Sequence, residues 1–262
     1  MDDASADDGE TRRDPRQLVD RRGEGVAIQD GEVGGIPGRQ EAALALSPTW
    51  EAAEAARAIP EIASWAGGRG IGDDRLRVGG ICLHYGGDVE VARVLHASQP
   101  YTGWAGFVES ANAPEAYRAQ AALAARHGLR VSTLVTRCLP EVLDAWEAVH
   151  AETPISWRRW VLVHLGVASP AELARIRRFG AVVTTNPISY LWRSGAAEVD
   201  RLGGEAERLI PHRSLLAHRI PFALATDNKP PDPWLAFAAA VTRRDMASGA
   251  VLGASEDRKS VV

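Results

Sequence analysis

Residues 159–187 read RWVLVHLGVASPAELARIRRFGAVVTTNP, and the order of apolar and amphipathic segments in this stretch indicates the fold class. It holds two apolar runs of strand length, 160–165 and 181–186, around one amphipathic segment of helix length. Ser169, Pro170 and Glu172 follow the pattern of a helix start with a capping box, and Gly180 marks the helix end. The stretch therefore predicts a strand, a helix and a second strand of a parallel sheet.

The same alternation extends to both sides of this unit. Another helix is expected from Pro114 to the residue before Gly128. Most of the strand candidates are apolar on both faces, as parallel strands covered by helices are. The further strand candidates are 42–47, 77–85, 129–135 and 221–227.

Polar residues stand at the ends of several predicted strands, which indicates a barrel rather than an open sheet with one switch point. They are His84, residues 132–136, His164, Thr185 with Asn186, and Asp227. The chain has no glycine-rich phosphate loop of the dinucleotide or P-loop form. The predicted fold class is α/β, a partial (β/α) TIM-type barrel.

Composition sets the domain organisation and the partners. The chain has 262 residues, 45% of them hydrophobic, and residues 1–40 mix charge and glycine with almost no apolar periodicity. We expect a disordered segment over 1–40 and one barrel domain over 41–262. A net charge of -4 argues against a nucleic-acid partner and favours a small-molecule substrate. Whether the protein forms a homo-oligomer is left open.

Cysteine content and hydropathy bear on the compartment. Cys82 and Cys138 form neither a disulfide framework nor a paired zinc-knuckle spacing, which is typical of a reducing cytoplasm. No run approaches the roughly eighteen apolar residues that a membrane span needs, and the acidic start does not resemble a signal peptide. The sequence predicts a cytoplasmic protein without a membrane segment.

His164 and Asp227 are the best candidates for chemistry. An imidazole and a carboxylate at two strand ends of a barrel can converge on one point, where they bind a divalent metal or share a proton. The alternative for His164 is a hydrogen-bonded structural histidine. The alternative for Asp227 is an N-cap of the following helix.

Residues 159–253 resemble the amidohydrolase superfamily of metal-dependent enzymes, in particular the branch of N-substituted formamide deformylases. Residues 159–187 resemble the sixth barrel strand with its metal-binding histidine, then a helix and the seventh strand. Residues 211–237, PHRSLLAHRIPFALATDNKPPDPWLAF, resemble the eighth strand with its catalytic aspartate. Residues 240–253, AVTRRDMASGAVLG, resemble the helix that follows.

The resemblance implies a hydrolase of carbon–nitrogen bonds other than peptide bonds, with a divalent metal that activates water for attack on an amide, formamide or carbamate. It makes His164 a metal ligand and Asp227 the general base, with a second role for Asp227 on the metal. It makes Arg213 and Arg243 substrate-binding or supporting residues. A solvated or ion-paired arginine is the alternative for each.

Upstream, RVGGICLHYGGD at 77–88 resembles the fourth strand, and Cys82 stands where many members carry a carboxylated lysine. A thiolate is a zinc ligand, and Cys82 and His84 at i and i+2 point to the same side of a strand. The pair therefore predicts a rewired metal site that takes zinc. The alternative is a buried thiol beside a structural histidine.

The sequence also departs from the family. Ser132 stands where the fifth strand carries a histidine, and the His-x-His pair of the first strand occurs nowhere in the chain. The chain is expected to be a piece truncated at both ends. An incomplete amidohydrolase-like protein without catalysis is therefore the second hypothesis. A metal-free aldolase or lyase is the third, with Lys229 as the one candidate lysine near a strand end.

Overall fold

The computed structural model describes residues 28–31, 40–45, 52–68, 70–73, 76–86, 111–136, 138–226 and 232–256. Of the segment 1–40, for which disorder was predicted, only residues 28–31 and 40 are described, and the rest lies outside the described residues. Asp227 and Lys229 also lie outside them.

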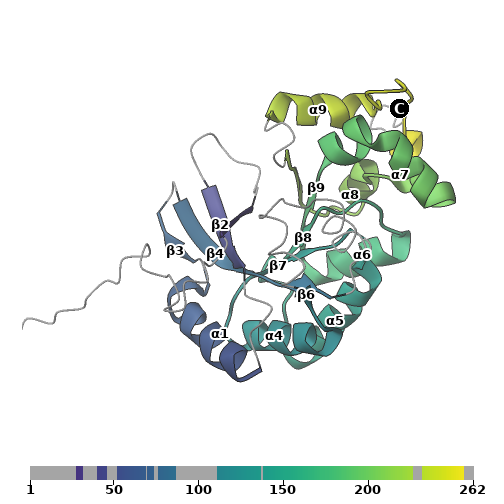
Figure 1. The fold of residues 1–262 in the computed structure, drawn as a ribbon. Helices are drawn as coiled ribbons and strands as arrows, with labels where there is room; N and C mark the ends of the chain where they lie inside the picture. Colours follow the sequence, from purple (N-terminus) through teal and green to yellow (C-terminus); the bar gives the residue numbers. More distant parts are fainter. Residues whose placement is uncertain are drawn as a thin grey trace, which may run out of the picture.

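The central feature is one curled, mainly parallel sheet in the order β1-β2-β4-β7-β8-β9-β10 (Figure 1). Neighbouring strands from β2 to β10 pair in parallel, whereas β1 pairs antiparallel with β2 and β3 pairs antiparallel with β4. The strands are β1 (Ile28–Gly31), β2 (Gln40–Ala45), β3 (Ile71–Gly72), β4 (Leu76–Cys82), β7 (Val131–Leu134), β8 (Val161–Val163), β9 (Val182–Thr185) and β10 (Phe222–Leu224). The prediction of a partial TIM-type barrel is confirmed.

Helices cover the outer face of this half-barrel, one after another along the curled sheet (Figure 1). They are α1 (Ala52–Ala66), α4 (Pro114–Arg126), α5 (Leu139–Glu152), α6 (Pro170–Phe179) and α8 (His212–Ala217). Helices and sheet share one buried core, in which the ring of Trp146 meets the rings of Trp160 and Phe179 edge to face. Burial of these large rings supplies much of the apolar stabilisation between sheet and helices.

The predicted helix signals of the central unit are all present. The hydroxyl of Ser169 accepts the amide of Glu172, and the carboxylate of Glu172 accepts the amide of Ser169 at 2.6 Å. Gly180 ends α6 with φ 60°, a left-handed conformation that glycine adopts without steric cost. The local pattern alone therefore fixes both ends of this helix.

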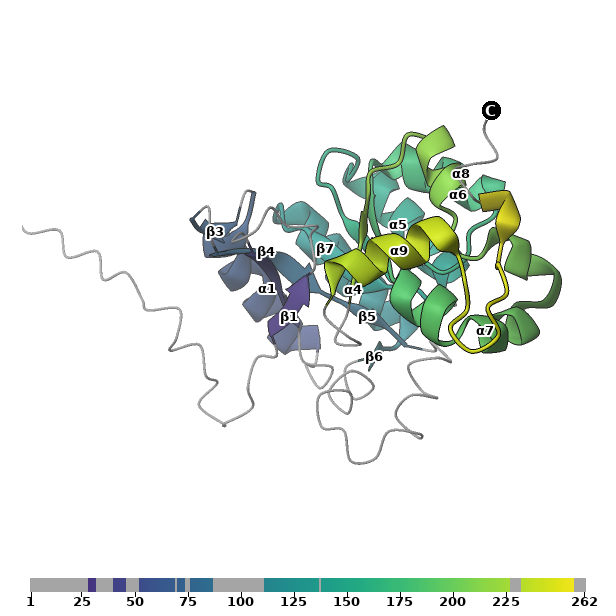
Figure 2. The same cartoon turned by 90° about the horizontal axis from the view of Figure 1, so that it is seen from above.

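The C-terminal part adds short helical turns beyond β9. They are η2 (Ile188–Arg193), a π-helix, then α7 (Gly195–Leu202), η3 (Gly203–Arg208), α9 (Pro233–Thr242) and η4 (Ala254–Glu256). Figure 2 shows α9 crossing in front of the sheet, and α9 packs against η2. A small second core forms here from Leu191, Leu209, Ile210 and Leu252.

One expectation from the resemblance is wrong. Residues 240–253 were expected to form a helix, but α9 ends at Thr242 and Arg243 takes a left-handed φ of 53°. The chain then turns back, so that Arg244 bridges Val251. The carboxylate of Asp245 causes the turn, because it accepts the amides of Ala247 and Ser248 and so competes with helical hydrogen bonds.

A second, two-stranded sheet follows the end of β4. It pairs β5 (His84–Tyr85) in parallel with β6 (Ala111–Asn112).

Among the described helices, none is long and apolar enough to cross a membrane.

Candidate metal centre and the adjoining pocket

The strand register separates the two faces of the half-barrel. Thr133, Leu162 and Val183 are fully buried, and Thr133 reaches Tyr117 of the outer helix α4. Side chains alternate along a strand, so the neighbouring positions Cys82 and Ser132, which pair directly, face the concave side. Cys82, which the sequence predicts to be a metal ligand, therefore lies on the concave side of the half-barrel.

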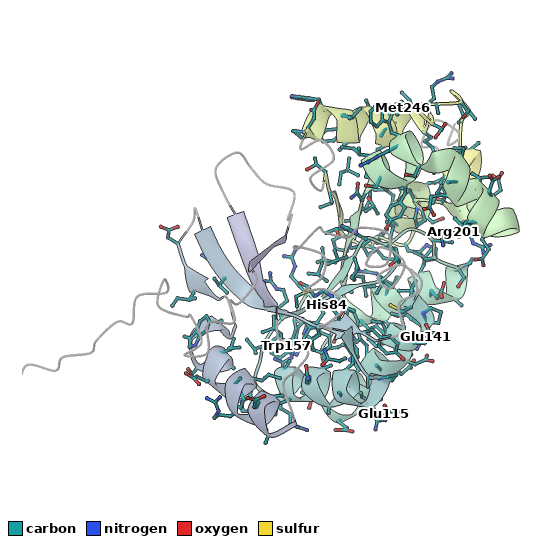
Figure 3. All side chains as sticks on the ribbon, in the orientation of Figure 1. His84, Glu115, Glu141, Trp157, Arg201 and Met246 are labelled. Carbon is teal, nitrogen blue, oxygen red and sulfur yellow. The ribbon has the colours of Figure 1, made fainter. Side chains whose placement is uncertain are left out.

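Cys82 and His84 lie together, as their i and i+2 spacing predicted. The Sγ of Cys82 lies 3.7 Å from Nε2 of His84, and the two residues are 1% and 3% exposed. Asn112 donates to the carbonyl of His84 at 3.3 Å, and Gln120 donates to Asn112 at 2.9 Å. This chain of hydrogen bonds from α4 holds the backbone of His84 in place. Figure 3 shows His84 near the middle of the curled sheet.

The Cys82–His84 pair has the spacing of two ligands on one zinc ion. Bond lengths of about 2.3 Å to sulfur and about 2.0 Å to nitrogen at a tetrahedral angle separate the two donors by roughly 3.5 Å. The observed 3.7 Å fits this value. Burial raises the pKa of the Cys82 thiol to about 12, so that metal binding would release the thiol proton.

His164 lies at the end of β8, two strands along the sheet from β4. Its φ is 59°, a left-handed conformation that non-glycine residues seldom adopt outside functional or tightly held positions. Its amide donates to Thr184 Oγ1 at 3.3 Å, and its ring meets that of Tyr190 edge to face at 6.5 Å between centroids. The chain thus bends at His164, and η2 supports its ring.

The other positions at which the family carries metal ligands do not complete a metal site among the described residues. Ser132 stands beside Cys82 in the sheet, at the place of the family's fifth-strand histidine. Among the described ranges, no three histidine, cysteine or acidic residues are grouped as a metal site would need. Asp227, the predicted fourth contributor, lies outside the described residues.

The two arginines predicted to bind substrate make contacts that tie segments together. Arg213 on α8 donates to the carbonyl of Ser255 at 3.0 Å. Arg243 is fully buried and donates to three carbonyls, those of Leu252 at 2.8 Å, Ile210 at 3.2 Å and Leu209. These contacts account for a supporting role of Arg243, and contact of either arginine with substrate stays a prediction.

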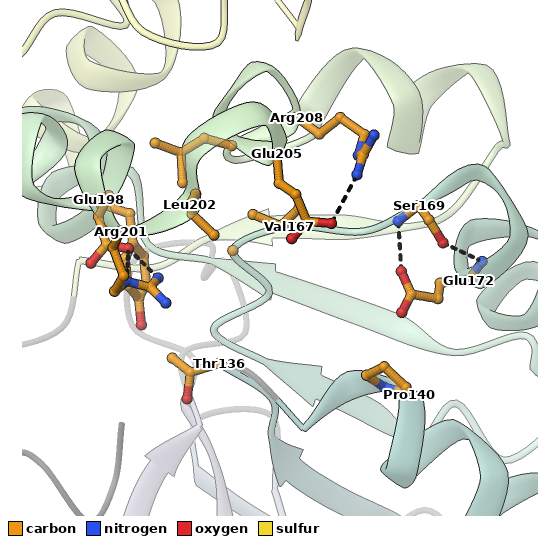
Figure 4. A pocket seen from close by; sticks show the side chains of 13 residues that line it. Thr136, Pro140, Val167, Ser169, Glu172, Glu198, Arg201, Leu202, Glu205 and Arg208 are labelled. Atoms are coloured by element: carbon orange, nitrogen blue, oxygen red, sulfur yellow. Dashed lines mark hydrogen bonds and ion pairs between the residues drawn. The ribbon is translucent and has the colours of Figure 1, made fainter. Parts of the chain in front are cut away.

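A pocket of about 310 Å³ lies beyond the ends of β7 and β8, and the sequence did not predict it (Figure 4). Its wall includes Thr136 after β7, Gly166 after β8 and Tyr190 of η2. Two Glu-x-x-Arg pairs complete it, Glu198 with Arg201 and Glu205 with Arg208. Their repeated spacing in 198–208 was the signal in the sequence. Because Tyr190 also touches His164, the pocket adjoins the candidate metal centre.

Comparison with known proteins agrees with this architecture. Residues 17–259 match the model of the amidohydrolase family. The chain belongs to that family. As an amidohydrolase, it resembles an uncharacterised metal-dependent hydrolase from Pyrococcus horikoshii OT3, with 21% identity and a TM-score of 0.53 over 79% of this chain and 41% of that one. A second such hydrolase, from Pyrococcus furiosus, shows 20% identity and a TM-score of 0.50 over 71% and 38%.

This amidohydrolase chain thus spans about two fifths of the length of these solved relatives. Among curated proteins, no match was found. At these identities the two structures support the fold of the half-barrel and no more.

Proposed function

We propose that this amidohydrolase hydrolyses a carbon–nitrogen bond other than a peptide bond, in a small molecule, with water activated by a divalent metal. The bond is of the amide, formamide or carbamate type, and the branch is that of the N-substituted formamide deformylases. Family membership and the half-barrel support the reaction class. The resemblance of residues 159–187 and 211–237 supports the branch.

The contact between Cys82 and His84 carries the proposal. Two buried donors at 3.7 Å, at the carboxyl end of β4, have the spacing and the chemistry of a zinc chelate. His164 ends β8 at the same edge of the sheet, where barrel enzymes place their reacting groups. Zinc bound there would polarise the carbonyl and lower the pKa of a bound water.

The residues of the chain would bind the metal, transfer a proton and position the ligands in this reaction. Cys82 and His84, which lie in contact, would hold the metal. The resemblance alone adds His164 as a further ligand, and it makes Asp227 the base that would take the proton of the attacking water. The buried surroundings of Cys82 and His84 exclude bulk water from the ligand side of the site. Thr184 fixes the main chain of His164 by accepting its amide.

A second candidate is an amidohydrolase-like protein without catalysis. Ser132, a poor metal ligand, lies beside Cys82 where the family carries histidine, and the sequence has no His-x-His pair. Such a chain would bind a metal or a ligand and turn nothing over.

Metal content and turnover, measured together, separate the two candidates. Elemental analysis of the wild type should give close to one equivalent of zinc, iron or manganese, and Cys82→Ala, His84→Ala and His164→Ala should lose it. Cys138→Ala is the matched control, because Cys138 is also a buried thiol but donates to the carbonyl of Leu134. Less than about a tenth of an equivalent in the wild type would refute the hydrolase.

Turnover is measured on the same samples. Metal-loaded wild type should hydrolyse N-substituted formamides, N-acyl amines or carbamates, and Asp227→Ala should lose the activity while it keeps metal bound through the other ligands. Bound metal with no hydrolysis of any of the three classes would leave the non-catalytic candidate.

A further inference from the structure

The pocket beside His164 holds two ion pairs that differ in strength. Arg201 donates from both Nε and Nη2 to a single oxygen of Glu198, and the two side chains are only 23% and 9% exposed. Arg208 meets Glu205 through one contact of 3.2 Å, with side chains 38% and 63% exposed. An exposed pair held by one contact contributes little, so Glu205 is the partner that is exchanged at low cost.

Arg208 also carries a donor that no described residue accepts. Its Nε is buried and has no hydrogen-bond acceptor among the described residues. A guanidinium binds a carboxylate best through two parallel N–H groups, and the Nε–Nη edge is one such pair. A carboxylate that displaced Glu205 from Arg208 would satisfy the buried Nε as well as Nη2.

The rest of the wall limits what enters. Val167, Leu202 and Leu209 line the pocket with apolar side chains. Its volume of about 310 Å³ is at the lower end of the range for small-molecule sites. Arg201 neutralises Glu198, so the single positive charge of Arg208 is what the wall offers to a ligand, and it matches a monoanion better than a dianion such as phosphate. A compact ligand with one carboxylate fits these properties best.

We propose that this pocket is a subsite for the carboxylate of a small substrate, and that Arg208 exchanges Glu205 for that carboxylate on binding. The naming of the ligand as substrate rests on the proposed hydrolase function. Tyr190 lines the pocket and touches His164, so a substrate with its carboxylate on Arg208 extends past Tyr190 toward the metal centre.

Calorimetric titration with N-acetylglycine and N-acetylglycinamide tests the subsite, because the two probes differ only in carboxylate against carboxamide. The wild type should bind the acid about tenfold more tightly than the amide. Arg208→Gln should bind the two probes equally. Glu205→Gln should bind the acid several times more tightly than the wild type, because the competing carboxylate is gone.

Arg178→Gln is the matched control. Arg178 is ion-paired with Glu147 on the outer helices, at similar exposure, and lies away from the pocket wall. It should keep the wild-type preference for the acid. Equal affinity of the wild type for both probes, or an unchanged preference in Arg208→Gln, would overturn the proposal. So would weaker binding of the acid by Glu205→Gln.

The metal content of the wild type, compared with its preference for the acid, distinguishes the two proposals, and the same titration on His164→Ala is the check. If the wild type holds no metal but prefers the acid through Arg208, the hydrolase function fails and the carboxylate subsite stands. If metal is bound and the preference is absent, the subsite fails and the hydrolase function stands. His164→Ala should keep the preference, since Arg208 does not depend on the metal.

Discussion

The Sγ of Cys82 lies 3.7 Å from Nε2 of His84, where β4 passes into β5, and both residues are buried. A thiol and an imidazole at this distance form either a weak hydrogen bond or two sides of a metal site. In an amidohydrolase half-barrel this position belongs to the edge that carries chemistry, which favours the metal site. The contact is therefore the link between this fold and its proposed function.

Arg243→Met should destabilise the protein strongly. The buried guanidinium satisfies the carbonyls of Leu209, Ile210 and Leu252, and its removal leaves these acceptors without their donor. The expected loss is about 3 to 5 kcal/mol of unfolding free energy, measured by urea denaturation.

The neighbouring Arg244→Met is the control for that measurement. Arg244 donates to the carbonyl of Gly249 near the surface, so its loss should be below about 1 kcal/mol. Similar losses for both variants would contradict the supporting role of Arg243.

Protonation of His212 should make the protein less stable in mild acid. Burial, and then the positive charge of Arg243, lower the pKa of His212 from 6.5 to about 3. Above pH 6.5 the residue is neutral in both states, and below it only the unfolded chain takes up the proton. Stability should therefore fall from pH 6.5 down to about pH 3, by up to roughly 1.4 kcal/mol per pH unit from this residue.

His212→Gln should flatten that dependence. Urea midpoints of wild type and variant, measured from pH 7.5 to pH 4, give the slopes. His212 lies 2.8 Å from Thr185 Oγ1 and stacks on Phe222, whereas Nδ1 of the partly exposed His218 lies 2.9 Å from the carbonyl oxygen of Ser214. His218→Gln should keep the wild-type slope, and an unchanged slope in His212→Gln would refute the assignment.

Tyr117→Phe should weaken the packing of α4 and α5 on the sheet. The hydroxyl of Tyr117 lies 2.8 Å from Thr133 Oγ1 and accepts Nε1–H of Trp146 at 2.9 Å, so its removal leaves both partners buried and unsatisfied. The expected loss is about 1 to 3 kcal/mol. Tyr85→Phe, on the ring that packs against Tyr117, serves as the control and should lose less.

Several features of the fold follow from local patterns and were predicted. Apolar runs located β2, β4, β7, β8, β9 and β10 to within a few residues, and cap residues located both ends of α6. The period of a strand was enough to place Cys82 and His84 on one side. These predictions depend only on residues close in sequence.

The features that were missed depend on contacts between distant residues. Arg243 donates to carbonyls more than thirty residues away, and no residue spacing in the sequence predicts these contacts. The left-handed turn at His164 and the π-helical path that brings Tyr190 against it are set by packing at the end of the sheet. The pocket lies between such segments, although its two Glu-x-x-Arg pairs are visible in the sequence.

X-ray absorption at the zinc edge of the metal-loaded protein measures whether Cys82 binds the metal. The Cys82–His84 chelate predicts one sulfur ligand at about 2.3 Å from zinc, which disappears in Cys82→Ala and remains in Cys138→Ala. A shell of nitrogen and oxygen alone in the wild type, or a sulfur ligand that survives in Cys82→Ala, would contradict it.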